Sequence, residues 1–115
     1  MEKIFFANDL VQPILEKEKT STWRINEDVP FRRSNTVGLK EDEIVALCDD
    51  SGVEFARARI VEIKDTVFGE LSKEEKTDHG QFLSDLEMYQ TFTRYYQTEI
   101  SARSKLRIIK FEIVA

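Results

Sequence analysis

The segment that most constrains the fold is IVALCDDSGVEFARARIVEIKDTVF, residues 44–68. An apolar run is followed by turn-forming residues from Asp49 to Gly52 and then by a partly alternating run of apolar and charged residues. Two such runs on either side of a short polar turn are typical of antiparallel strands. The chain is therefore predicted to contain a β-hairpin here. Cys48, at the end of the first run, is expected to be a packing residue rather than a reactive thiol.

The stretch before the hairpin predicts a helix and a strand. Asp9 is able to cap a short helix, with Gln12 three residues later, and the helix is expected to end near Lys17. Pro13 is tolerated because it falls within the first turn, whose amides have no acceptor in the helix. TSTWRI then predicts a strand because β-branched and aromatic residues dominate it. The turn-rich residues that follow, 26–43, predict a loop with short extended pieces.

Two helices and a last strand are predicted after the hairpin. Ser72 with Glu75 and Ser84 with Glu87 each match the S-x-x-E capping box, which marks the start of a helix. Residues 105–114 end in clean alternation of apolar and charged side chains, which is typical of a strand. The second helix, residues 85–96, is expected to pack through Leu86, Tyr89, Phe92 and Tyr96, with Met88 and Tyr95 flanking that stripe.

This order of elements favours an α+β fold. The sheet is expected to be mainly antiparallel and to form a small barrel, with one helix near the N-terminus and two inserted before the last strand. The 115 residues suffice for one domain, 1–115, and their composition is that of a globular protein. No apolar run is long enough to cross a membrane and no signal peptide is evident, so a cytoplasmic location is expected. One cysteine and one histidine cannot build a Cys/His metal cluster, and no metal or other cofactor is expected.

The charge pattern bears on the partner. The net charge of −5 by itself argues against binding to nucleic acid. However, residues 1–40 carry seven basic and six acidic side chains, residues 41–100 carry six and fifteen, and residues 101–115 carry four and one. The two ends of the chain are therefore predicted to form a basic face if they meet in space.

The segment ILEKEKTSTWR, residues 14–24, resembles the signature of the ASCH domain, a small member of the PUA-like superfamily with the approximate pattern I-L-x-G-x-K-T-x-T-x-R. The order of the later elements is similar too, so the resemblance extends over nearly the whole chain. Two departures are evident: Lys17 stands in place of a glycine, and Glu41-Asp42 stand in place of Gly-Asp before the hairpin. The matching residues are Ile14, Leu15, Lys19, Thr20, Thr22 and Arg24.

The resemblance implies a PUA-like β-barrel with RNA or a modified nucleoside as its ligand. Within the strand, Thr20, Thr22 and Arg24 point to one face, and Lys19, Ser21 and Trp23 to the other. A twist or bulge at the start of the strand would bring the two sets to one cleft. The ligand-binding residues predicted in this way are Lys19, Thr20, Thr22, Trp23 and Arg24, joined by Arg32 and Arg33 beside Phe31 in the loop.

Members that resemble N4-acetylcytidine amidohydrolases imply an enzyme instead. In that hypothesis Lys19 takes the proton of Thr22, whose hydroxyl attacks an amide carbonyl. The family's glutamate is expected before a Gly or Asn after a short helix, and His79 stands at that position, with Asp78 as the nearest carboxylate. Because histidine titrates near neutrality, an acid/base role for His79 is retained.

Each of these residues also has a plain structural alternative. The alternative for Lys19 and His79 is a solvated residue at a helix end, for Arg24 the partner of an acidic side chain, and for Trp23 a core residue. Three functions are thus weighed: a binding module for RNA or a nucleoside, an amidohydrolase, and a protein-interaction domain whose cleft is unused. The missing glutamate places the binding module ahead of the enzyme. The oligomeric state is open.

Overall fold

A computed structural model describes residues 1–25, 38–79 and 82–114, with Asp78 and His79 described by their backbone alone. Its element order is β1 (Lys3–Phe5), η1 (Asn8–Leu10), α1 (Val11–Leu15), β2 (Ser21–Arg24), β3 (Ile44–Cys48), β4 (Glu54–Val67), η2 (Phe68–Glu70), α2 (Lys73–His79), α3 (Asp85–Tyr96) and β5 (Lys105–Ile113). The predicted α+β class, the early helix and the two helices inserted before the last strand are confirmed.

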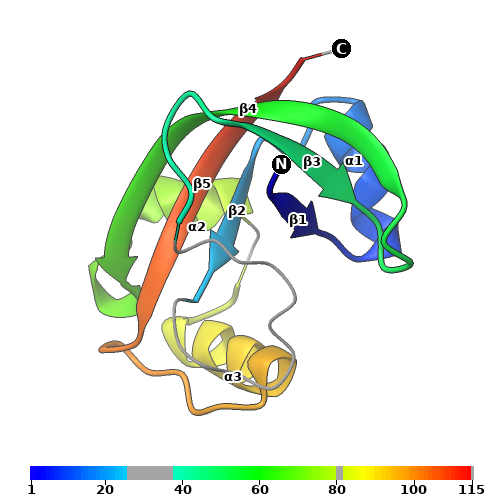
Figure 1. The fold of residues 1–115 in the computed structure, drawn as a ribbon. Coiled ribbons are helices and arrows are strands. Elements are labelled where there is room, and N and C mark those ends of the chain that lie inside the picture. The colour runs from blue at the N-terminus through cyan, green and yellow to red at the C-terminus, as the bar shows by residue number, and fades with distance from the viewer. Residues whose placement is uncertain (26–37, 80–81, 115) are drawn as a thin grey trace.

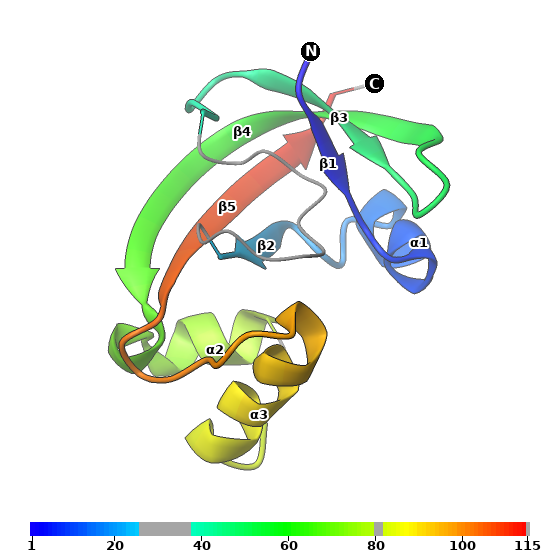
Figure 2. The same ribbon diagram turned by 60° about the horizontal axis from the view of Figure 1, so that its bottom comes forward.

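The five strands form one sheet in the order β1-β3-β4-β5-β2. β1 runs parallel to β3, and the other three pairings are antiparallel. β4 is the longest strand, and an irregularity between Ile60 and Glu62 marks the point where it shifts register against β5. Figures 1 and 2 show β4 arching over the molecule, so that the sheet curves strongly. Among the described residues, β1 and β2 remain the two edges of the sheet, and no strand pairing closes it into a barrel.

The predicted hairpin is confirmed. Asp49 closes its turn, since the carboxylate accepts hydrogen bonds from the amides of Ser51 and Val53 at 2.9 and 3.0 Å. Gly52 has a φ of 83°, which glycine adopts without a steric cost. Cys48 is fully buried at the end of β3, and burial raises the pKa of its thiol.

Side chains pack on both faces of the curved sheet. β5 contributes to both, with Ile109 and Phe111 on one face and Leu106 and Ile108 on the other. The inner core lies against α1 and β1 and contains Ile4, Phe6, Ile14, Leu39, Val45, Leu47, Ala58, Ile60, Ile109 and Phe111. The α3 core contains Trp23, Ile25, Phe68, Leu71, Met88, Phe92, Tyr96, Ile100, Leu106 and Ile108.

Both predicted capping boxes start helices. In the first, Glu75 and Ser72 exchange bonds reciprocally, at 2.8 and 3.1 Å. In the second, the Ser84 hydroxyl accepts from the Glu87 amide at 3.2 Å, but the Glu87 carboxylate binds the amide of Leu83 instead of that of Ser84.

The predicted stripe of α3 is wrong at one position. Leu86 is 64% exposed, whereas Met88 is buried. The buried face centres on Phe92, and Leu86 lies about 120° around the helix from it. Met88 lies four residues before Phe92 and therefore takes the core position.

The predicted helix cap is also wrong. The chain enters α1 through the 3₁₀ turn η1, in which the amide of Leu10 bonds to the carbonyl of Ala7 at 2.9 Å. Asp9 therefore does not cap, and Gln12 donates to Glu16 instead. Among the described residues, no helix has the length and apolar character that crossing a membrane requires.

Candidate functional site

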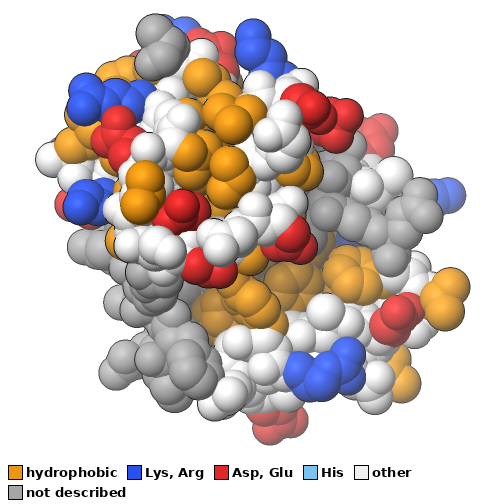
Figure 3. All heavy atoms as spheres, turned by 90° about the vertical axis from the view of Figure 1, so that its right-hand side faces the viewer, with side chains coloured by type: hydrophobic (Ala, Val, Ile, Leu, Met, Phe, Trp, Pro, Cys, Tyr) orange, Lys and Arg blue, Asp and Glu red, His pale blue; other side chains and the backbone are white. Residues whose placement is uncertain are grey.

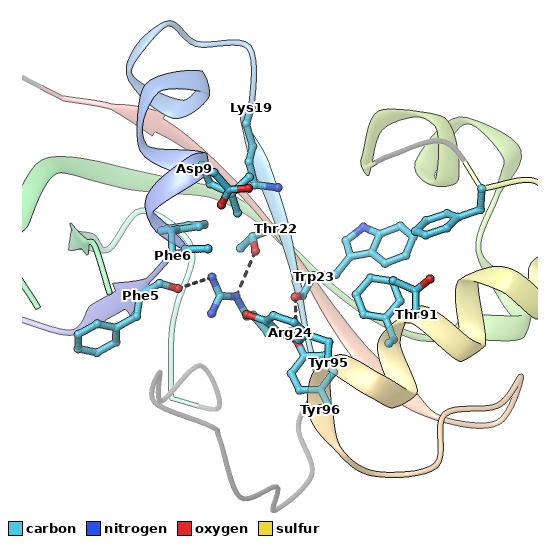
Figure 4. A pocket seen from close by; sticks show the side chains of 14 residues that line it. Phe5, Phe6, Asp9, Lys19, Thr22, Trp23, Arg24, Thr91, Tyr95 and Tyr96 are labelled. Atoms are coloured by element: carbon cyan, nitrogen blue, oxygen red, sulfur yellow. Dashed lines mark hydrogen bonds between the residues drawn. The ribbon is translucent and has the colours of Figure 1, made fainter. Parts of the chain in front are cut away.

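A cavity of about 340 Å³ lies between the β1–η1 segment, β2 and α3. Four residues of the predicted binding segment line it: Lys19, Thr22, Trp23 and Arg24 (Figure 4). Its volume is within the range of small-molecule sites. The structure thus brings together residues that the strand pattern alone placed on opposite faces.

The position of β2 explains how both faces reach one cavity. Among the described strands β2 pairs on one side only, with β5, and residues of β2 and α3 line the same cavity. Thr22 lies opposite Ile109 of the inner core, and Trp23 lies opposite Ile108 of the α3 core, so the predicted alternation is confirmed. Because the cavity lies beside the edge of the strand, side chains from both faces border it.

Arg24 bridges the two edge strands of the sheet. Its guanidinium donates from Nη2 to the carbonyl of Phe5 in β1 at 2.8 Å, and from Nε to the Thr22 hydroxyl at 3.1 Å (Figure 4). Its Cζ also lies 4.9 Å from the centre of the Phe6 ring. Burial lowers the pKa of this guanidinium, while Tyr96 and Tyr95 act in the opposite direction. Arg24 therefore fixes the positions of β1 and Thr22 relative to each other.

Lys19 is the titratable group of most chemical interest. Burial, followed by the charge of Arg24, lowers the pKa of its ammonium from 10.5 to about 8. A sizeable neutral fraction is therefore present at mildly basic pH, and an amine in that state accepts a proton. Within the described part of the chain, the Lys19 side chain forms no ion pair or hydrogen bond.

The lowered pKa predicts that stability depends on pH. Between pH 8 and 10.5 the unfolded chain holds a proton on Lys19 that the folded chain has released, so the free energy of unfolding should rise with pH across that window. Urea unfolding at several pH values should show this rise, which Lys19→Met should remove. Lys17→Met changes an exposed lysine and should keep the rise; equal slopes in all three proteins would contradict the prediction.

The aromatic residues that line the cavity differ in how exposed they are to solvent. The Trp23 ring is buried and stacks on Phe92 with centroids 5.7 Å apart, so it serves mainly as a core residue. The Tyr96 hydroxyl donates to the Trp23 carbonyl at 3.3 Å. Tyr95, by contrast, is 64% exposed and lines the cavity. The sequence predicted Tyr95 only to flank the packing stripe of α3. The sequence signal that could have placed it at the cavity is its position one residue before the buried Tyr96.

Asp9 is a second residue that sequence reasoning missed as part of the site. It is exposed on η1 and is the one carboxylate among the described residues that line the cavity. Figure 4 draws it at the same end of the cavity as Lys19. The sequence pattern had predicted Asp9 to be a helix cap, and it borders the cavity because it lies in the 3₁₀ turn η1 instead.

The other predicted site residues are not brought to this cavity. Thr20 is exposed and lines two other cavities, which Lys19 also borders. Arg32 and Arg33 lie outside the described residues. His79 and Asp78 end α2, and the orientation of their side chains also lies outside the description.

The predicted basic face is not formed along β5, although β2 and β5 do pair. Arg107 makes two bonds to Asp65, at 2.7 and 2.8 Å, and Lys110 lies 3.8 Å from Glu62. Two acidic side chains of β4 thus neutralise Arg107 and Lys110 across the strands.

On the face drawn in Figure 3, hydrophobic side chains gather in a hollow between the upper and lower parts of the molecule. The residues that line the cavity include Phe5 and Leu10 from one side and Phe82 and Tyr95 from the other. An apolar lining with a few polar groups is the usual composition of a ligand site.

No family model matches the chain, and no curated protein matches it. Among solved structures it is similar to a DUF984 protein from Enterococcus faecalis V583, with 19% identity and a TM-score of 0.66 over 93% of this chain and 68% of that one. An ASCH domain from Lactobacillus crispatus JV V101 is 15% identical, with a TM-score of 0.61 over 95% and 79% of the two chains. A variant of the ASCH protein of Zymomonas mobilis is 14% identical, with a TM-score of 0.61 over 96% and 66%. The chain therefore has the fold of ASCH domains.

Proposed function

We propose that residues 1–115 form a single ASCH-like domain of the PUA-like superfamily, which binds a nucleobase of RNA or of a modified nucleoside in the cavity beside β2. The observation that carries this proposal is the meeting of Lys19, Thr22, Trp23 and Arg24 in one cavity with aromatic residues of α3. In this proposal Arg24, with its bond to Phe5, takes the place of strand pairing between β1 and β2.

The chemistry of the cavity suits a flat ligand with a polar edge. The exposed ring of Tyr95 offers a stacking surface, and stacking on an aromatic side chain contributes about 1–3 kcal/mol per base. The Lys19 ammonium and the Thr22 hydroxyl supply hydrogen-bond donors for ring nitrogen or carbonyl oxygen atoms. Apolar walls and donors together favour a base over a lipid or a simple anion.

The charges outside the cavity favour a nucleoside or a short single-stranded segment over a long polynucleotide. Arg107, Lys110 and Arg59 are each paired with an acidic residue, so they do not form a continuous track for phosphates. Phosphate contacts make binding strongly dependent on salt, whereas stacking hardly does. Affinity for a nucleoside is therefore expected to change little with ionic strength.

An amide-shift NMR titration tests the proposal. Cytidine, N4-acetylcytidine and a short single-stranded RNA are added to the labelled protein, and shifts are expected at residues 19–24 and 91–96. Lys19→Met should weaken binding, because a donor is lost, while Lys17→Met should not. If no nucleoside or RNA moves any resonance, the proposal fails and a protein partner becomes the leading candidate.

A second candidate function, amidohydrolysis of an N4-acylated cytidine, is favoured by one observation. The Lys19 amine, with a pKa of about 8, borders the same cavity as the buried Thr22 hydroxyl. Neutral Lys19 would take the proton of the Thr22 hydroxyl while the Thr22 oxygen bonds to the acyl carbon. The N4 amine of cytidine would then leave with a proton from His79 or Asp78, and water would release the acyl group from Thr22. In the same NMR tubes, cytidine and acetate should appear with wild type and not with Lys19→Met. Their absence with wild type restricts the chain to binding.

A further inference from the structure

Asp9 and the donors of the cavity form a complementary set. The polar side chains that border it include the ammonium of Lys19 and the guanidinium of Arg24, which only donate hydrogen bonds, and the carboxylate of Asp9, which when ionised only accepts them. Hydroxyls of Thr22 and Thr91 are able to do both. A ligand that satisfies this set must carry an acceptor and a donor on one edge.

Asp9 is available for such a role. It caps no helix, and among the described residues its side chain takes part in no ion pair or hydrogen bond. It borders the same cavity as Lys19, yet the two charges do not pair with each other. An acid and a base that share an apolar cavity without pairing are both free to bind a ligand placed between them.

Bases differ in what they present to a carboxylate. Cytosine and adenine carry an exocyclic amino group, a donor, beside a ring nitrogen that accepts. Uracil and hypoxanthine carry a carbonyl oxygen at the corresponding position, and a carboxylate facing that oxygen leaves two acceptors opposed. Acidic side chains are accordingly the usual partners of the cytosine amino group.

We infer that Asp9 determines specificity in this cavity by accepting a hydrogen bond from the exocyclic amino group of the ligand, so that amino-bearing bases are preferred over their oxo counterparts. This inference rests on the proposed function, since it assigns the class of base that the cavity accepts. The ammonium of Lys19 then donates to the ring nitrogen or the carbonyl of the same base.

The test compares two matched pairs of ligands, cytidine with uridine and adenosine with inosine, by calorimetry or NMR titration. Wild type is expected to bind the amino member of each pair about tenfold more tightly, the discrimination of a single well-placed contact. Asp9→Asn should abolish the preference, because an amide is able both to accept from an amino group and to donate to a carbonyl oxygen. Asp42→Asn makes the same change of charge at an exposed position that does not line the cavity and should leave the preference intact.

The outcomes separate the inference from the proposed function. If Asp9→Asn binds nucleosides and keeps the wild-type preference, or if it loses affinity equally for both members of a pair, the inference is overturned while nucleoside binding stands. If wild type binds none of the four nucleosides, the inference and the proposed function both fail. A circular-dichroism melt of each variant shows that a lost preference does not come from unfolding.

Discussion

Replacing Phe92 with alanine is expected to lower the free energy of unfolding by about 4 kcal/mol, the usual cost of removing a buried phenylalanine ring. The ring is only 8% exposed and lies at the centre of the α3 core. Its centroid is 5.5 Å from that of Phe68, 5.7 Å from that of Trp23 and 6.2 Å from that of Tyr96. Because the same ring also borders the cavity, its loss should weaken ligand binding as well.

Urea unfolding measures this change, and Leu86→Ala is the matched control. Leu86 lies on the same helix but is 64% exposed, so its truncation should change stability by no more than about 0.5 kcal/mol. If Phe92→Ala leaves too little folded protein, Phe92→Leu keeps part of the volume and should show a smaller loss. Equal effects of Phe92→Ala and Leu86→Ala would show that α3 is not held through this ring.

The parts of the fold that the sequence predicted correctly depend on local patterns. The hairpin turn needs only Asp49 and Gly52 with apolar runs on either side, and each capping box spans four residues. Such features are decided by neighbours in the chain, so their residue types suffice to predict them. The exposure of Leu86 was mispredicted because several helical stripes fit one periodic segment, and tertiary packing chooses among them.

The parts that were missed depend on residues far apart in the chain. β1 has three residues, too few to show a period, and it becomes a strand only because β3, some 40 residues later, pairs with it. Barrel closure was predicted from the order of elements, but in the described residues a guanidinium joins the two edges in place of backbone pairing.

The site could be predicted in part. The resemblance pointed to the segment from Lys19 to Arg24, and four of its residues meet in the cavity. The segment's departure at Lys17 also has a structural counterpart, because its φ of 63° lies in the left-handed region that favours glycine. Asp9 and Tyr95 could not be assigned to the site, because their places depend on how η1 and α3 pack beside β2.

Replacing Arg24 with lysine is expected to lower the free energy of unfolding by about 2 kcal/mol, even though the charge is kept. A hydrogen bond to a charged group contributes about 1.5–3 kcal/mol, and a lysine ammonium cannot reproduce the fork that reaches Phe5 and Thr22 together. The edges of the sheet at β1 and β2 should then separate. Nucleoside affinity should fall with stability, because residues from both edges line the cavity.

Comparison with Arg24→Met separates the geometry of this side chain from its charge. Both variants lose the fork, so both should destabilise the protein, and urea unfolding measures this against Arg94→Lys, an exposed control on α3.

Only Arg24→Met also removes the positive charge that helps to lower the pKa of Lys19. In that variant the pKa of Lys19, followed by NMR of its side chain, should rise above about 8 but stay below 10.5, because burial still acts on it. A wild-type stability in Arg24→Lys would show that the link between β1 and β2 does not depend on the guanidinium. An unchanged Lys19 pKa in Arg24→Met would show that burial alone sets the state of that amine.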